Sequence, residues 1–259
     1  MKAHSTGYIF GFATVVCLVC SVFVSAAAVL LKPKQDENKI LDRQKKVLIV
    51  AGLLREDERV AAAEITERFD DNIVARVVDL KSGAYADDVD AASFDQLRAS
   101  KESSTSRQAP KNAAKVARLP HRALVYQVQE RGQVRKLILP IEGKGLWSTL
   151  YGFVALAGDT NTIEGITFYK HGETPGLGGE IDNPAWKALW KGRRVSDDAG
   201  KLSIEVVKGS AGPPADDPHR VDGLSGATIT SRGVSYLVQF WLGEHGFAPY
   251  LAGFRESRS

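Results

Sequence analysis

The sequence contains few of the side chains that bind metals or form disulfides. Its 259 residues include only two cysteines, Cys17 and Cys20, and five histidines that lack the spacing of metal ligands. Both cysteines fall in an apolar N-terminal run, where we interpret them as small apolar side chains, with a dithiol or metal pair as the alternative. The rest of the chain has no cysteine that would report its redox compartment. We therefore predict no metal site.

The chain also lacks an excess of one charge. Its formal net charge is +3, and no basic stripe is interleaved with aromatic residues, so nucleic acid is not an expected partner. Apolar residues make up 44% and charged residues 25%, a balance typical of a folded domain. There is no pairing of a nucleophile with a base and no dinucleotide-binding glycine fingerprint, so we predict no catalytic residue.

A long apolar run is present near the N-terminus. Tyr8–Leu31 carries no charge over 24 residues, and roughly 20 apolar residues suffice to cross a bilayer as a helix. A cleaved signal peptide is the alternative, because Ser25–Ala28 are small, but the run exceeds the usual ~7–15 apolar residues of such a leader. We therefore predict a retained transmembrane anchor.

The side of the membrane does not follow from the charges around this run. Lys2 alone precedes it, whereas six basic residues follow within positions 32–46. That bias would leave the main domain in the cytoplasm, but long domains translocate largely regardless of charge.

The segment after the anchor alternates between helical and polar patterns. Pro33 is expected to break the helix, and helical patterns resume over residues 36–54 and 55–69. Residues 72–80 are rich in β-branched side chains and predict a strand. Residues 81–120 are mostly small, polar and charged, which indicates a surface excursion or flexible insertion.

The C-terminal half predicts an antiparallel sheet with helices. The expected elements are strands at 122–129, 134–140, 151–156, 162–169 and 202–207, with a hairpin around residues 130–133. We also expect a short helix at 183–190 capped by Asn183, and a helix from about residue 230 with Val234, Leu237, Val238 and Trp241 at helical spacing. The predicted fold class is α+β: one N-terminal transmembrane helix, then a domain with a mainly antiparallel sheet and flanking helices. We divide the chain into residues 1–31 (tail and anchor), 32–120 (helical stalk, strand and variable insertion) and 121–259 (main domain).

One glycine-bearing loop leads directly into the C-terminal helix. Residues 222–231 read DGLSGATITS, and Gly226 and Ala227 allow close approach of the backbone to a ligand. The free N–H groups and positive dipole end of the helix suit a phosphate, although a hydroxyl helix cap after a turn is the alternative. The nearby hydroxyls able to donate to phosphate oxygens are those of Ser225, Thr230 and Ser231.

A second loop is rich in proline and glycine. Residues 171–181 read HGETPGLGGEI, a composition typical of an exposed, tightly turned segment. Taken alone, a turn-rich loop of this kind is usually a plain connector, and a ligand-binding loop is the alternative.

Both loops resemble motifs of FMN-binding proteins. Asp222–Thr228 resembles the sequence that flavin transferases recognise when they esterify FMN phosphate to the last threonine, here Thr228. The resemblance implies that Asp222 is read by the transferase and that the phosphodiester keeps about one negative charge, which the helix terminus would stabilise by ~0.3–1 kcal/mol. The Glu-Thr-Pro-Gly-Leu-Gly loop is similar to one that borders the isoalloxazine ring, with Leu177 against the ring and Thr174 at its polar edge. The implied FMN-binding residues are Glu173, Thr174, Gly176, Leu177, Gly178, Ser225, Gly226, Ala227, Thr228 and Thr230.

The whole chain is similar to the C subunit of the sodium-translocating NADH:quinone oxidoreductases, and more distantly to the G subunit of Rnf complexes. The resemblance runs from the anchor through residues 44–53 (QKKVLIVAGL) and 143–148 (GKGLWS) to both flavin motifs. It implies that residues 121–259 form an FMN-binding domain on the periplasmic side of a bacterial inner membrane.

The same resemblance implies partners and an electron path. Electrons would arrive from an iron–sulfur centre and leave toward the flavin of the B subunit, within a six-subunit complex that exports sodium and in which the B, D and E subunits are the nearest neighbours. A flavin transferase would act during maturation, and NADH oxidation and quinone reduction would belong to partner subunits.

Some assignments stay open at this point. Glu142, Lys144 and Trp147 either help to shape the flavin pocket or serve packing and partner contacts. His171 and Glu173 as acid–base groups are disfavoured, because electron transfer requires none. Two other functions remain: a membrane-tethered FMN module with a regulatory or maturation role, and a secreted domain whose leader is removed.

Overall fold

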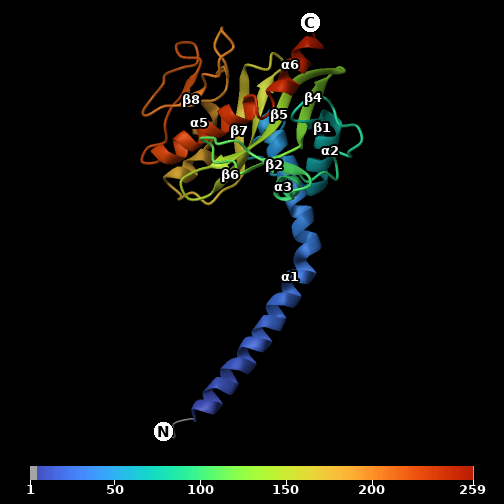
Figure 1. Ribbon diagram of the computed structural model, residues 1–259, viewed down its shortest axis with the longest axis vertical. Coiled ribbons are helices and arrows are strands. Elements are labelled where there is room, and N and C mark those ends of the chain that lie inside the picture. The colour runs from blue at the N-terminus through green and yellow to red at the C-terminus, as the bar shows by residue number, and fades with distance from the viewer. Residues whose placement is uncertain (1–4, 259) are drawn as a thin grey trace. The chain divides into compact units, whose positions relative to one another are not determined.

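The computed structural model describes residues 5–258, and contacts divide the chain into two compact units with their boundary between Arg43 and Gln44. Helix α1 (Thr6–Ala51) contributes its first part to the N-terminal unit and its last turns to the C-terminal unit (Figure 1). Within residues 5–258, α1 is long and apolar enough to cross a membrane by length and composition, with a mean hydropathy of 2.6 over its most apolar window.

Pro33 lies inside α1, so the expected break at this proline and the separate helix from residue 36 are wrong. The proline ring removes one backbone hydrogen bond. Helical residues on both sides keep their own hydrogen bonds, and propagation of an existing helix is far easier than starting a new one. One proline therefore does not end this helix.

The C-terminal unit is built on a five-stranded sheet in the order β1-β4-β5-β6-β7. All four neighbouring pairs are antiparallel, which confirms the predicted α+β class with a mainly antiparallel sheet. The strands are β1 (Ile73–Asp79), β4 (Arg122–Glu130), β5 (Gln133–Lys144), β6 (Thr149–Ala157) and β7 (Ile163–Lys170).

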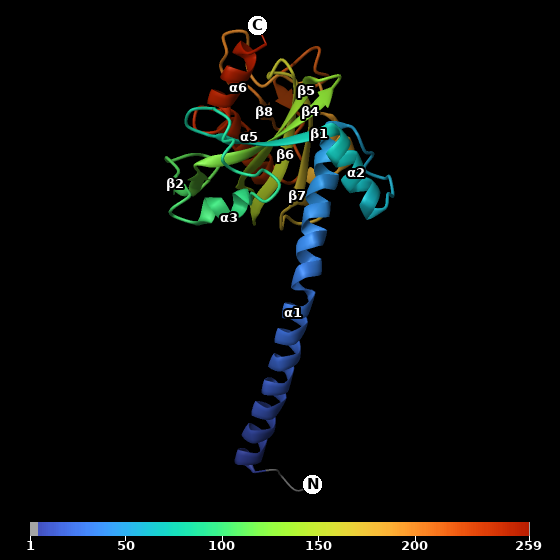
Figure 2. The same cartoon turned by 90° about the vertical axis from the view of Figure 1, so that its right-hand side faces the viewer.

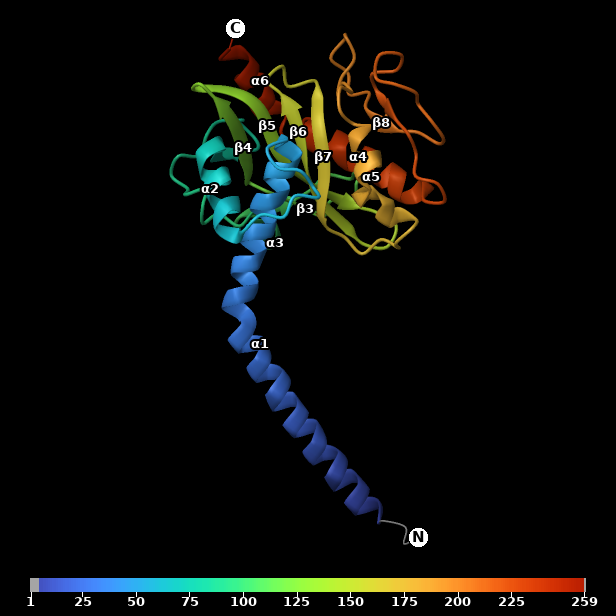
Figure 3. The same ribbon diagram turned by 180° about the vertical axis from the view of Figure 1, so that it is seen from behind.

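Helices cover both faces of this sheet. Figures 1 and 3 view the domain from opposite sides and show α5 (Thr228–Leu242) on one face and the last turns of α1 on the other. Helix α6 (Ala248–Glu256) and the short α4 (Pro184–Ala188) join the core on the α5 side, and Asn183 caps α4 as predicted. Figure 2 shows α2 (Ala62–Asn72) beside the end of α1.

Alternation along β5 sorts its side chains between two cores. Leu137, Leu139 and Ile141 pack with the buried residues of α5, which include the predicted inner positions Val234, Leu237, Val238 and Trp241. Successive strand residues point to opposite faces. Lys136 thus faces the α1 side, where its Nζ donates to the carbonyl of Ala51 at 2.8 Å.

The predicted hairpin between β4 and β5 is confirmed. Arg131 and Gly132 have φ values of 51° and 76°, and Glu130 pairs with Gln133. Two consecutive positive φ angles give the turn the twist that a two-residue hairpin needs.

Several other expectations need correction. The helix expected over 55–69 begins only at Ala62, because the chain before it forms turns. The strand expected over 202–207 is limited to β8 (Glu205–Val206), which pairs in parallel with β9 (Arg220–Val221). Residues 81–120 are not only a surface excursion. They contain α3 (Gln96–Lys101), β2 (Ser106–Gln108) and β3 (Arg118–Pro120), and they bury Ala114, Val116 and Leu119 in the core. Helix α6 was not predicted.

Candidate functional site

The first turn of α5 presents one threonine to solvent and buries another. Thr228 is the first residue of the helix and is exposed, whereas Thr230 is fully buried. The preceding turn is fixed by Gly226, whose φ of 69° suits glycine, and by Leu224, whose N–H donates to Ser231 Oγ at 3.1 Å. The loop therefore holds the hydroxyl-bearing Thr228 at a defined and accessible position.

A cavity of about 400 Å³ lies beside Thr228. Its lining includes Ser225 and Ser231 from the motif and two cations, Lys208 and Arg232, which have exposed side chains. Among residues 5–258 neither cation has an ion-pair partner. Neither cation was predicted from the sequence. Arg232 stands one helical turn after Thr228, a spacing that could have revealed it, whereas nothing in the sequence marks Lys208.

Asp222 holds the wall of this cavity. Its carboxylate accepts hydrogen bonds from Ala211 N at 2.8 Å and Ser210 Oγ at 3.1 Å, and Gly223 N donates to the carbonyl of Gly209 at 2.8 Å. The loop that carries Lys208 is thus tied to the motif itself.

The second predicted loop contacts the first. A Cβ built on Gly226 would lie 2.9 Å from Leu177 Cδ2, so the two motifs touch. Leu177 keeps 45% of its surface exposed. The turn is closed by the Thr174 carbonyl, which accepts from Leu177 N at 3.1 Å and Gly179 N at 2.9 Å, while Gly176 has a φ of 76°. Thr174 is exposed at the same loop.

Glu173 points away from solvent and is held by protein donors. Its carboxylate accepts from the N–H groups of Leu146, Trp147 and Ser148 at 3.0–3.1 Å, from Ser148 Oγ at 3.1 Å, and from Thr230 Oγ1 at 2.6 Å. Burial favours the neutral acid, but the hydrogen bonds from Thr230 and the backbone outweigh it and hold the pKa of Glu173 below its ordinary value. The hydroxyl hydrogen of Thr230 is therefore used inside the protein.

Residues 145–148 form a third loop at the site. Trp147 is 68% exposed and Leu146 is 42% exposed, and Lys144 Nζ donates to the carbonyl of Trp147 at 3.0 Å. Leu177 touches Gly226 of the cavity lining, and Glu173 joins the 145–148 loop to Thr230 in the first turn of α5.

His171 and Glu142 do not join this arrangement as free acid–base groups. His171 Nε2 lies 2.7 Å from Asp182 Oδ2, and its Nδ1 accepts from Glu173 N at 3.2 Å, so the ring braces the loop. The adjacent Gly143 faces Leu237 of α5, and alternation therefore places Glu142 on the opposite face of the sheet. Burial raises the pKa of Glu142 to about 7, and the positive charge of Lys101 offsets part of that rise.

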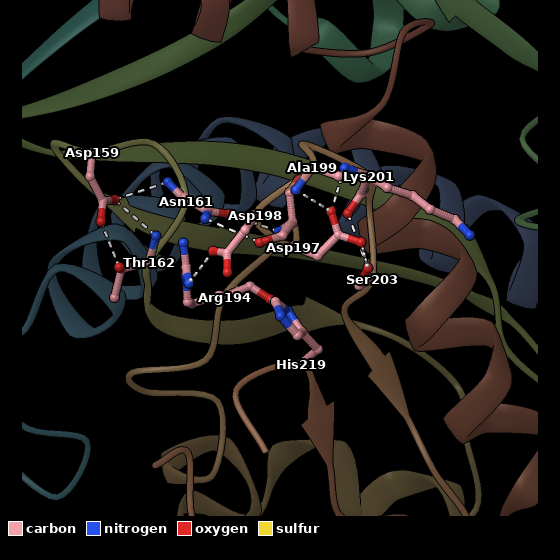
Figure 4. A network of polar contacts seen from close by, with 11 residues as sticks. Asp159, Asn161, Thr162, Arg194, Asp197, Asp198, Ala199, Lys201, Ser203 and His219 are labelled. Atoms are coloured by element: carbon pink, nitrogen blue, oxygen red, sulfur yellow. Dashed lines mark hydrogen bonds and ion pairs between the residues drawn. The ribbon is translucent and has the colours of Figure 1, made fainter. Parts of the chain in front are cut away.

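A second cavity, of about 630 Å³, lies between the 194–202 segment and the C-terminal helices. Figure 4 shows that three of its carboxylates, those of Asp159, Asp197 and Asp198, are already engaged by neighbouring groups. Asp159 accepts from Asn161 N, Thr162 N and Thr162 Oγ1 at 2.6–2.9 Å, and Asp197 accepts from the N–H groups of Ala199 and Lys201 at 2.9–3.0 Å. Within residues 5–258 no group of three or more His, Cys, Asp or Glu is placed to hold a metal.

Comparison with known families assigns a class to the loops at Thr228. Residues 145–243 match the family model of the FMN-binding domain. The matched range contains the 145–148 loop, both predicted motifs and the whole of α5, so this is an FMN-binding-domain protein.

Whole-chain relatives define the family more narrowly. The C subunit of the Na(+)-translocating NADH-quinone reductase of Pseudomonas aeruginosa is 49% identical over 95% of this chain and 95% of the relative, and that of Yersinia pestis is 49% identical over 93% and 90%. The crystal structure of Shewanella oneidensis NqrC matches with a TM-score of 0.77 and 35% identity, covering 85% of this chain and 99% of that one. The chain belongs to the NqrC family, the C subunits of the Na(+)-translocating NADH-quinone reductases.

Proposed function

We propose that Thr228 carries FMN through a phosphoester bond. The observation that supports this most directly is the exposed Thr228 hydroxyl at the start of α5, beside a cavity lined by Lys208 and Arg232. The linkage replaces the hydroxyl hydrogen with the FMN phosphoryl group and leaves about one negative charge, which two cations and a helix N-terminus favour.

The site has two groups of N–H donors that could bind an anion: the 145–148 loop, which binds the Glu173 carboxylate, and the first turn of α5, which in our proposal binds the phosphate. The three consecutive N–H groups of residues 146–148 are filled by Glu173, so they have no capacity for a phosphate. In the part of the chain that the structure describes, the first turn of α5 and the cavity at Lys208 hold no protein carboxylate in this way, and they adjoin Thr228, where the phosphate would be attached. Ser225, Gly226, Ala227 and Ser231 would then border the phosphate.

Leu177 and the 145–148 loop fit the apolar ring of a flavin. Leu177 and Trp147 are both exposed. Leu177 lies on the loop that touches Gly226, and Trp147 lies on the loop that Glu173 joins to Thr230 in the first turn of α5. Thr174, Gly176 and Gly178 shape the loop that holds Leu177. A flavin supplies redox chemistry, accepting two electrons and releasing them singly. Thr230 and Glu173 belong to the scaffold of this site in our proposal.

The chain would act as a fixed electron-transfer station within the multi-subunit reductase. We infer that it passes electrons to the flavin of the B subunit, that the B, D and E subunits are its neighbours, and that a flavin transferase modifies it. We further infer that α1 anchors it in a bacterial inner membrane as a single span with the C-terminal unit in the periplasm. The apolar α1 and the NqrC relatives support the membrane anchor; the periplasmic side rests on the resemblance alone.

The attachment is tested with Thr228→Val, which keeps the side-chain shape and removes the hydroxyl. In a host with an active flavin transferase, we expect the wild-type band to fluoresce after denaturing electrophoresis, and the peptide with Thr228 to gain the mass of FMN minus water. The Thr228→Val band should be dark, while Thr66→Val, at an exposed helical threonine of α2, should fluoresce like wild type. Retained covalent flavin in Thr228→Val would refute this acceptor.

A further inference from the structure

The carboxylate of Glu173 is buried without a cation. Glu173 is only 5% exposed. Among residues 5–258, no lysine, arginine or histidine forms an ion pair with its carboxylate. All the stabilisation of its charge comes from the neutral donors already described. Hydrogen bonds to an ionised acceptor are roughly twice as strong as neutral ones, so five of them can offset burial.

These donors come from segments that are distant in the sequence. Leu146, Trp147 and Ser148 precede Glu173 by 25–27 positions, and Thr230 follows it by 57. Thr230 stands two residues after Thr228, and Trp147 is the most exposed side chain of its loop. The Glu173 carboxylate thereby connects the 145–148 loop, which exposes Trp147, with the first turn of α5, which exposes the Thr228 hydroxyl.

Two glycines pack directly on this carboxylate. A Cβ on Gly145 would lie 2.7 Å from Glu173 Oε1, and a Cβ on Gly178 would lie 2.6 Å from Thr230 Oγ1 and 2.8 Å from Glu173 Oε2. All three distances are shorter than van der Waals contact. The group formed by Gly145–Ser148, Glu173, Gly178 and Thr230, which we call the Glu173 clamp, has no spare room.

We propose that Glu173 is a positioning residue that holds the 145–148 loop and the first turn of α5 in one arrangement, and that this arrangement makes Thr228 competent for flavin attachment. The inference rests on the proposed function of Thr228 and adds a residue that acts through others. A carboxylate is required because glutamine has one acceptor oxygen, and its amide group would direct donors at the N–H groups it faces.

The test compares Glu173→Gln with Glu180→Gln in the full chain. Glu180 lies in the same loop and accepts a hydrogen bond from the Asn183 side chain at 2.8 Å, outside the clamp. In Glu173→Gln we expect amide hydrogen exchange at residues 146–148 to rise by about tenfold or more, and covalent flavin to fall severalfold. Glu180→Gln should match wild type in both measurements.

Thr230 provides a second and milder variant. Thr230→Val removes one donor while keeping the shape, and should raise exchange at residues 146–148 and lower flavin yield. Thr230→Ser restores the hydroxyl and should return both toward wild type. This pair carries the test if Glu173→Gln fails to fold, as judged by circular dichroism.

The outcomes separate this inference from the proposed function. Wild-type exchange and wild-type flavin yield in both Glu173→Gln and Thr230→Val would overturn the clamp while leaving Thr228 as the acceptor. Faster exchange with full flavin yield would overturn its role in attachment. Absence of covalent flavin from the wild-type protein would remove the proposed function, and the exchange measurement would still decide whether Glu173 orders the loop.

Discussion

Glu142 provides a quantitative test of the electrostatics on the sheet face opposite α5. Its carboxyl has an ordinary pKa of 4.5, which burial raises to about 7 in the folded protein. It lies opposite Tyr151 in the β5–β6 register, and burial together with the charge of Glu142 raises the pKa of that tyrosine. We predict that Glu142→Gln changes the pH dependence of stability.

The sign follows from proton binding. Between pH 4.5 and about 7 the folded protein keeps a proton on Glu142 that the unfolded chain releases. The stability that this proton confers is complete below the unfolded pKa and is lost as pH rises through the folded pKa. The full interval corresponds to about 3 kcal/mol at ~1.4 kcal/mol per pKa unit. Because the side chain keeps partial contact with solvent, we expect about 1–3 kcal/mol.

The assay is urea unfolding of the full chain in detergent, followed by fluorescence of its four tryptophans. Glutamine stays neutral at every pH, so the free energy of unfolding of Glu142→Gln relative to wild type should rise by about 1–3 kcal/mol between about pH 5 and about pH 8. Glu130→Gln, at an exposed carboxyl, should show no such trend. A difference between Glu142→Gln and wild type that stays constant with pH, or falls as pH rises, would refute the reasoning.

Two further predictions concern backbone packing and charge. Gly83 and Gly132 have φ values of 75° and 76°, but a Cβ on Gly83 would lie 2.5 Å from the backbone of α6, whereas one on Gly132 would meet nothing within 4 Å. In chemical unfolding, Gly132→Ala should lower the free energy of unfolding by about 1 kcal/mol and Gly83→Ala by about 2–4 kcal/mol. Equal losses would contradict the packing argument. Replacing Lys208 and Arg232 together by glutamine should reduce the yield of covalent flavin on Thr228 severalfold, because the positive charge that would stabilise the phosphate is lost. The yield is measured by in-gel fluorescence against wild type. An unchanged yield would show that the two cations do not stabilise the phosphate.

Much of the fold follows from local patterns in the sequence. The hairpin at Arg131–Gly132 and the inner positions of α5 were predicted because turn chemistry and helical periodicity are read over a few residues. The continuation of α1 through Pro33 was missed, since a local rule for proline does not include the cooperativity of a long helix. The buried positions within residues 81–120 were also missed, because Ala114 and Leu119 become core residues only through contacts with distant segments.

The site was predicted as two motifs and not as an assembly. The resemblance pointed to Thr228 and Leu177, but no sequence pattern indicates that Leu177 touches Gly226. Lys208 enters the cavity only because Asp222 ties its loop to the motif. Such contacts join residues far apart in the chain, and they depend on how the 145–148 loop, the 171–182 loop and α5 pack.

The two threonines at the start of α5 show how helical geometry places similar side chains in different surroundings. Thr228 and Thr230 are both hydroxyl residues at the start of α5, and either could be expected to meet a phosphate. At about 100° per residue, two positions along a helix place side chains roughly 200° apart. One is therefore exposed beside the cavity while the other is buried against Glu173. A hydroxyl that already donates at 2.6 Å to a buried carboxylate cannot give up its proton without leaving that charge short of a donor. In our proposal, the same contact that fixes the turn would therefore restrict attachment to Thr228.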